Sequence, residues 1–202
     1  MVCNGGFYML GEMMLYTFAN LGGLNFYLSV LFAVILIGLA GFVAQKLAVA
    51  PLLEREGANM NVLLSTIGVG MMILYGAAAI WGTEVVPIKF PYAGSLHLGK
   101  IIITHAGLLL FIVGAIVIGA FHFFLSNTKL GKQTRATSQN PRGARLVGIN
   151  VERVHSFTMA VSTAMAGLAA ILKAPMLGAY SSMGEPMLIL GFVVVILGGM
   201  GN

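Results

Sequence analysis

One polar stretch decides how this chain is organised: TKLGKQTRATSQNPRGARLVGIN, residues 128–150. It interrupts an otherwise apolar sequence and has no acidic residue before Glu152. Its basic residues are Lys129, Lys132, Arg135, Arg142 and Arg145. Basic loops between apolar runs are typical of the cytoplasmic side of membrane proteins. The sequence therefore predicts a cytoplasmic loop over residues 128–153, open to a soluble partner, between two membrane spans.

Composition places the rest of the chain in a membrane. It is 58% hydrophobic and 8% charged, with a mean hydropathy of +0.95, whereas soluble domains are roughly 45–50% apolar and about 25% charged. The net charge of +5 lies mostly in loops, where topology explains it better than nucleic-acid binding. A single Cys3 excludes an internal disulfide and a cysteine metal cluster, and we expect no cofactor.

Charge-free runs mark the membrane elements, because a charge at a helix centre costs about 2.5–3.5 kcal/mol on insertion scales. At about 20 residues per span, the chain has room for five or six of them. The expected elements are 7–21, 24–44, 62–81, 101–125, 154–172 and 186–200. The fold class is therefore an all-α polytopic transmembrane helix bundle, a single transmembrane domain over residues 1–202.

Lysine and arginine counts give the orientation. Eight basic residues fall in the loops 46–61 and 128–153, against three on the other side of the alternating spans. The side richer in lysine and arginine is cytoplasmic. We therefore expect both loops in the cytoplasm and the 82–100 segment outside.

Small residues recur on the 154–172 span in two stripes, Ala160, Ala164 and Gly167 on one and Ser162, Ala166 and Ala170 on the other. Small residues let membrane helices approach closely. This span is expected to be buried in the bundle, as ordinary helix packing.

The basic loop contains signals for a short helix outside the bilayer. Gly131 is expected to end the preceding helix in a left-handed cap, and Asn140-Pro141 is a preferred helix start. With Gly148 closing the far end, the pattern predicts a helix over residues 141–147. So short a helix is marginal alone, so it either docks on a partner or rests on anionic lipid headgroups. Spacing leaves both interpretations open.

The loop closely resembles a known family. Its pattern Thr128-Lys129-x-Gly131-x3-Arg135-Ala136-x2-Gln139-Asn140-x3-Ala144-x3-Gly148-Ile149 is similar to the cytoplasmic loop of the inner-membrane permease subunits of branched-chain amino-acid ABC importers. Supporting stretches are Gly5-x2-Tyr8-Met9-Leu10-Gly11, Leu63-Leu64-Ser65-Thr66-Ile67-Gly68 and Leu197-Gly198-Gly199-Met200-Gly201-Asn202.

The resemblance implies an ATP-driven permease in the cell inner membrane, coupled to separate ATP-binding cassette subunits. Its partners would be those subunits, a second identical or homologous permease subunit, a periplasmic solute-binding protein and membrane lipid, but no nucleic acid. The residues implied for ATPase coupling are Gly131, Arg135, Asn140, Ala144 and Gly148. Family members usually have one more helix at the start and further helices at the end, so we expect this chain to be a fragment of a longer permease.

Ionisable residues within apolar runs are candidates for function. Glu12, where the family usually has a small residue, either lines the transport pathway or simply reaches water or a neighbouring helix. His105 and His122 lie 17 residues apart, about 25 Å along a helix, which argues against a shared metal site.

The sequence favours a transport subunit over an enzyme. It contains no Gly-x4-Gly-Lys-Ser/Thr phosphate loop and no paired nucleophile and base. Energy would therefore come from a partner. The alternatives are an ABC permease for urea or a short amide, and a passive channel or secondary transporter in which Glu12 and the histidines form an ion path.

Overall fold

The computed structural model describes residues 4–52, 58–88, 94–98, 101–180 and 183–197. Its helices are α1 (Asn4–Tyr16), α2 (Phe26–Ala44), α3 (Ala58–Trp81), α4 (His105–Asn127), α5 (Lys129–Gln139), α6 (Pro141–Leu146), α7 (Val151–Leu177) and α8 (Gly184–Leu197). A π-helical turn, Thr17–Leu21, extends α1, and a second, Gln45–Val49, followed by the 3-10 turn Ala50–Leu52, extends α2. The segments long and apolar enough to cross a membrane are Phe26–Leu52, Leu64–Trp81, His105–Asn127 and Val151–Leu177.

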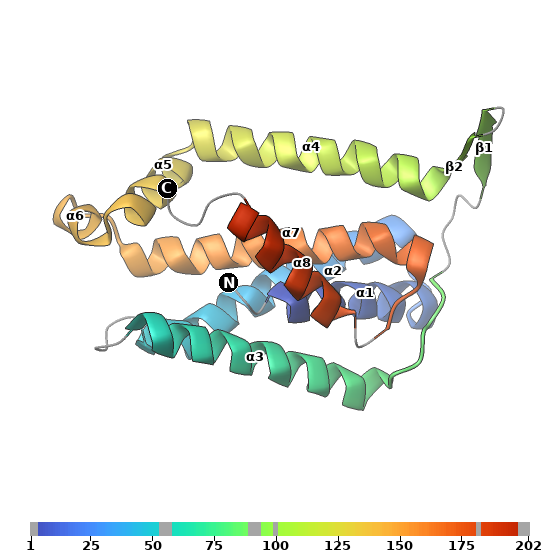
Figure 1. Ribbon diagram of the computed structural model, residues 1–202, viewed down its shortest axis with the longest axis horizontal. Helices are drawn as coiled ribbons and strands as arrows, with labels where there is room; N and C mark the ends of the chain where they lie inside the picture. The colour runs from blue at the N-terminus through green and yellow to red at the C-terminus, as the bar shows by residue number, and fades with distance from the viewer. Residues whose placement is uncertain (1–3, 53–57, 89–93, 99–100, 181–182, 198–202) are drawn as a thin grey trace.

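The long helices lie side by side along the longest axis of the molecule (Figure 1). At the centre, α1 packs against α7, α3, α8 and α2, and α7 has its most extensive contacts with α2 and α1. Helices α5 and α6 lie at one end of the bundle, and the hairpin of β1 (Ser95–Leu98) and β2 (Ile101–Thr104) lies at the other (Figure 1). The predicted all-α polytopic bundle is confirmed, with this hairpin added.

Glycines of α2 allow α7 to pack closely at the centre of the bundle, as the small residues of α7 predict. A Cβ at Gly38 of α2 would lie 3.4 Å from Cβ of Ala164. One turn further along α2, a Cβ at Gly41 would overlap the side chain of Thr163. Close backbone approach through small residues is how membrane helices gain packing energy, since lipid offers no hydrophobic driving force.

Hydrogen bonds close the end of the bundle that carries the hairpin. Trp81 Nε1 donates to Thr17 Oγ1 at 2.9 Å, which joins the last residue of α3 to the turn after α1. Val86 and Ala179 exchange backbone hydrogen bonds of 2.8 and 2.9 Å, so the segment after α3 pairs with the segment after α7.

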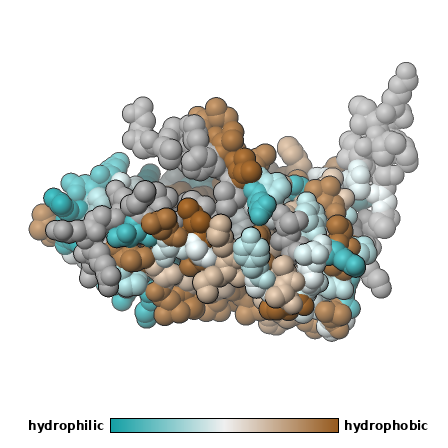
Figure 2. Space-filling model, turned by 60° about the horizontal axis from the view of Figure 1, so that its bottom comes forward, coloured by the Kyte–Doolittle hydropathy of each residue, from teal (hydrophilic) through white to brown (hydrophobic). Residues whose placement is uncertain are grey.

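The outer surface of the bundle is apolar. In the most hydrophobic part of α4 no residue is buried, and Phe111 and Ile118 of this helix are 75% and 69% exposed. Figure 2 shows hydrophobic residues over much of one face, with hydrophilic residues mainly at its left end and a few more scattered along it. A surface this apolar suits lipid or further membrane helices, not water.

The predicted span 101–125 starts too early. Residues 101–104 form β2, which pairs antiparallel with β1 so that Ser95 lies opposite Thr104 and Leu98 opposite Ile101. Three successive isoleucines and a threonine are β-branched and favour a strand over a helix. Hydropathy cannot separate the two, so α4 begins only at His105.

Candidate coupling surface and membrane-buried polar residues

The turn between α4 and α5 is built on Thr128 and Gly131. Thr128 has extended backbone angles that end α4, and its Oγ1 accepts a hydrogen bond from Gly131 N at 3.0 Å. Thr128 therefore acts as the N-cap of α5, a helix that the sequence interpretation missed.

The left-handed cap expected at Gly131 is wrong. This residue lies in the first turn of α5 and is buried, and a Cβ there would stand 2.5 Å from the carbonyl oxygen of Leu125. Glycine is required at this position because the two helices turn tightly around it, not because of a positive φ.

Helix α5 is amphipathic and lies against α4 and α7. Thr137 is 3% exposed on its inner face, whereas Arg135 is exposed. The Arg135 guanidinium donates through Nη2 to the carbonyl oxygen of Ser126 at 3.4 Å, so it spans the turn and helps to hold α5 against the end of α4.

The short helix predicted over 141–147 is confirmed as α6, one residue shorter. Asn140 is its N-cap, with Oδ1 accepting from Gly143 N at 2.9 Å, and Pro141 occupies the first position. Ala144 is 4% exposed and anchors the helix to the bundle. After Val147, Gly148 adopts φ +80°, the left-handed region that glycine enters without steric cost.

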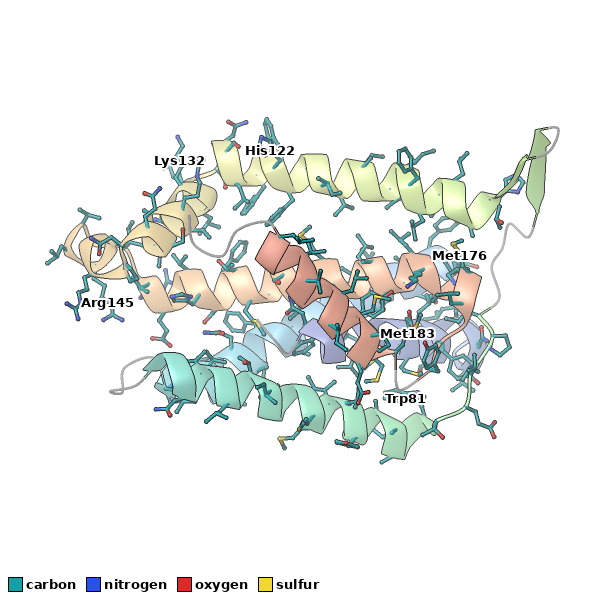
Figure 3. All side chains as sticks on the ribbon, in the orientation of Figure 1. Trp81, His122, Lys132, Arg145, Met176 and Met183 are labelled. Atoms are coloured by element: carbon teal, nitrogen blue, oxygen red, sulfur yellow. The ribbon has the colours of Figure 1, made fainter. Side chains whose placement is uncertain are left out.

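The outer side of α6 presents an apolar tip. Leu146 is 89% exposed and Val147 is 76% exposed, and Arg142 and Arg145 are exposed beside them. Figure 3 shows Arg145 and Lys132 at the end of the bundle opposite to Trp81. Both residues fall within the helix that the sequence predicts, but the direction they face depends on the burial of Ala144.

The two loops assigned to one side of the membrane do lie at the same end of the molecule. The turn Gln45–Val49, which contains Lys46, and the start of α3 lie at the end that carries α5 and α6 (Figure 1). Arg55, counted with this loop, is outside the described residues.

Within the bundle, Glu12 of α1 is 0% exposed, so it reaches neither water nor lipid in this structure. Neither of its carboxylate oxygens has a hydrogen-bond partner among the described residues. The nearby Lys173 of α7 attracts it, but the Lys173 ammonium lies 4.0 Å from Met187 Sδ instead. A buried carboxylate without hydrogen bonds is costly, so this position is a candidate for function.

A second buried polar side chain was missed from the sequence. Gln45 is 0% exposed, and both its amide nitrogen and its amide oxygen lack a partner in the described part of the chain. It begins the π-helical turn after α2. Such turns are frequent at functional sites. The only sequence signal is one polar residue at the end of a long apolar run.

The two histidines of α4 occupy opposite ends of the helix. His105 is its first residue, and its backbone N–H donates to the Gly94 carbonyl oxygen at 3.1 Å. His122 is exposed near the other end (Figure 3). Among the described residues no three His, Cys, Asp or Glu side chains come together.

Comparison with known proteins identifies the family. The model of a family described as the permease component of branched-chain amino acid transport systems matches residues 3–202. The probable branched-chain amino acid transport permease protein LivH of Methanocaldococcus jannaschii is 30% identical over 207 residues, which covers 97% of this chain and 63% of that protein.

Two bacterial relatives agree. The high-affinity branched-chain amino acid transport system permease protein BraD of Pseudomonas aeruginosa is 25% identical over 168 residues, 80% of this chain and 54% of the relative. Salmonella typhimurium LivH, whose description is the same, is 24% identical over 180 residues, 84% of this chain and 56% of the relative. The chain thus spans little more than half the length of these relatives, and no solved structure matches it. By the match over nearly its whole length, the chain belongs to the family of permease components of branched-chain amino acid transport systems.

Proposed function

We propose that this chain forms part of the permease of an ATP-driven importer of branched-chain amino acids, and that helices α5 and α6 dock on a separate ATP-binding subunit. One observation carries the proposal: a helix held by caps at both ends presents Leu146 and Val147, 89% and 76% exposed, at the tip of the bundle. The relatives are named as transport permeases for the same solutes.

The geometry of α6 suits a groove in a protein. Asn140, Gly148 and the buried Ala144 fix the helix, so little entropy is lost when it binds. The apolar tip flanked by Arg142 and Arg145 fits an apolar groove with an acidic rim. A helix resting on anionic headgroups would use the same side chains, so the two interpretations need an experiment.

The path from α6 into the membrane is short and stiff. Helix α7 follows α6 almost directly, with Asn150 Oδ1 accepting from Arg153 N at 2.9 Å as its N-cap. Helix α7 then contacts α2 and α1 across glycines. A movement of α6 by the closing ATPase would therefore rotate these helices together and switch the side on which the bundle is open.

The remaining assignments follow from this role. The loops 46–61 and 128–153 face the cytoplasm, and the chain works with a second permease subunit and a periplasmic solute-binding protein in the inner membrane. The chain hydrolyses no ATP itself. Gly131, Arg135, Asn140, Ala144 and Gly148 shape the coupling surface, and Glu12 is the candidate pathway residue.

The decisive experiment removes the apolar tip in the full-length subunit. With Leu146→Ser and Val147→Ser combined, we expect at least a roughly tenfold loss of co-purifying ATP-binding subunit, because buried anchors dominate interface energy. Leu47→Ser is the matched control, since Leu47 is 73% exposed at the same end of the bundle. Unchanged complex assembly and stimulated ATP turnover in the double variant would refute the docking role.

Two further variants test the residues that hold α5 and α6 in place. Gly148→Val forces a β-branched residue to φ +80°, and Arg135→Glu replaces the bond to Ser126 with repulsion from its carbonyl oxygen. Both should abolish docking while membrane insertion stays normal. A separate measurement distinguishes the alternative solutes: urea or a short amide would inhibit leucine uptake if it were transported instead. Solute flux that persists without the ATPase would indicate a channel or secondary transporter.

A further inference from the structure

Helices α1, α3 and α8 line a cavity of about 130 Å³ that is open on one side. Three glycines, one from each helix, line it: Gly6, Gly70 and Gly184. Its side-chain lining is largely apolar, including Ile67 and Leu74, and one exposed carboxylate, Glu185, stands at it.

Close backbone contacts beside the cavity explain why no side chain fills it. A Cβ at Gly6 would lie 3.2 Å from the Gly70 carbonyl oxygen, and a Cβ at Gly184 would lie 2.7 Å from the Gly5 carbonyl oxygen. The helices are therefore held together by bare backbone, and the space next to these contacts stays open. Gly70 lies halfway along α3, so the cavity is near the middle of the span.

The polar groups next to the cavity come from the first turn of α8. Met183, 1% exposed, packs with Tyr8 and Ala170 and fixes the entry to the helix, as its position between α8 and α1 in Figure 3 shows. Helix α8 therefore begins inside the bundle. The first turn of any helix has backbone N–H groups without intrahelical partners, and here that turn also carries the Glu185 carboxylate.

Donors and a carboxylate side by side complement a zwitterion. An α-amino acid carries one ammonium and one carboxylate, and helices that start near the bilayer midplane commonly face substrate carboxylates in transporters. The Glu185 carboxylate would pair with the ammonium. A lipid acyl chain has no group for Glu185, and urea or a short amide would leave the apolar part of the cavity empty.

We propose that this cavity holds the aliphatic side chain of the transported amino acid, with Glu185 binding its α-ammonium group. The inference rests on the proposed function, since it takes an amino acid as the solute. The volume fits a branched group of three or four carbons, because an apolar cavity of about 150 Å³ accommodates benzene.

The test uses the intact transporter in proteoliposomes, with ATPase and solute-binding subunits present, and measures leucine uptake. Glu185→Gln should raise KM for leucine about tenfold, as expected for loss of a charge-assisted bond. Leu74→Trp should fill the cavity and lower leucine uptake about tenfold. The controls are Glu84→Gln, an exposed carboxylate in the segment after α3, and Met72→Trp, 77% exposed on α3; neither should change uptake.

A variant that gains an activity distinguishes a change in the cavity from simple misfolding. Leu74→Ala enlarges the cavity and should raise the ratio of phenylalanine to leucine uptake about tenfold. If the wild type imports leucine but none of the three variants changes KM or this ratio by more than about twofold, the cavity is not the substrate site and the proposed function stands. A wild-type complex that assembles yet imports no leucine would overturn the proposed function and this inference together.

Discussion

Gly11 of α1 and Gly167 of α7 place two backbones in direct contact. A Cβ on Gly11 would lie 2.7 Å from the Gly167 carbonyl oxygen and 2.9 Å from its Cα. On another side of Gly167, a Cβ would lie 2.6 Å from Cδ1 of Ile37 in α2. Three helices therefore meet at one point. Gly11 cannot accept a side chain unless α1 and α7 separate, whereas a side chain at Gly167 would have to displace the end of Ile37.

We expect Gly11→Ala to destabilise the bundle by about 1–3 kcal/mol, the usual cost of overpacking. The measurement is the temperature at which the detergent-solubilised protein loses its monodisperse peak. Gly114→Ala in α4 is the control, because a Cβ there meets nothing within 4 Å and alanine favours the helix. Equal melting of Gly11→Ala and wild type would show that α1 and α7 are further apart than described.

The bond from Trp81 to Thr17 gives a spectroscopic prediction. Thr17→Val removes the acceptor of the 2.9 Å bond, and an unsatisfied indole N–H costs about 1–3 kcal/mol where it is shielded from water. The Trp81 emission, taken as the difference from a Trp81→Phe variant, should shift to the blue and the protein should melt earlier. Thr83→Val lies two residues from Trp81 and should leave the emission unchanged; a shift in both variants would contradict the assignment.

Substitution of Glu12 should affect transport without reducing stability. Glu12→Gln replaces a carboxyl group that is 0% exposed and has no hydrogen bond among the described residues, so the melting temperature should stay the same or rise. Leucine uptake should nevertheless fall at least about tenfold if the carboxylate lines the pathway. If Glu12→Gln keeps full stability and full leucine uptake, Glu12 does not line the pathway.

Thiol labelling of intact cells tests the orientation. In a Cys3→Ser background, Glu84→Cys should react with a membrane-impermeant maleimide from outside, whereas Lys132→Cys should react only after the cells are opened. Both positions are exposed, so accessibility within the protein does not differ. Labelling of Lys132→Cys from outside would invert the topology and end the docking proposal.

The chemistry of the chain by itself determined which segments lie in the membrane and most of the helices, although α5 was missed. Long charge-free runs must hydrogen-bond their backbone internally in lipid, so the spans could be located from composition. The caps of α6 were also predictable, because Asn140-Pro141 and Gly148 act through neighbours three or four residues away. The β2 strand was not, since its isoleucines satisfy the hydropathy of a span equally well.

Tertiary structure alone decided which faces meet and which polar groups are enclosed. Gly131 proved to serve close approach instead of a cap, and Gln45 and Glu12 became buried only because α1, α2 and α7 converge. Leu146 faces outward because Ala144 faces inward. The cavity at Gly184 depends on residues more than 100 positions apart in the chain. Contacts of that range arise when helices pack, and no local pattern records them.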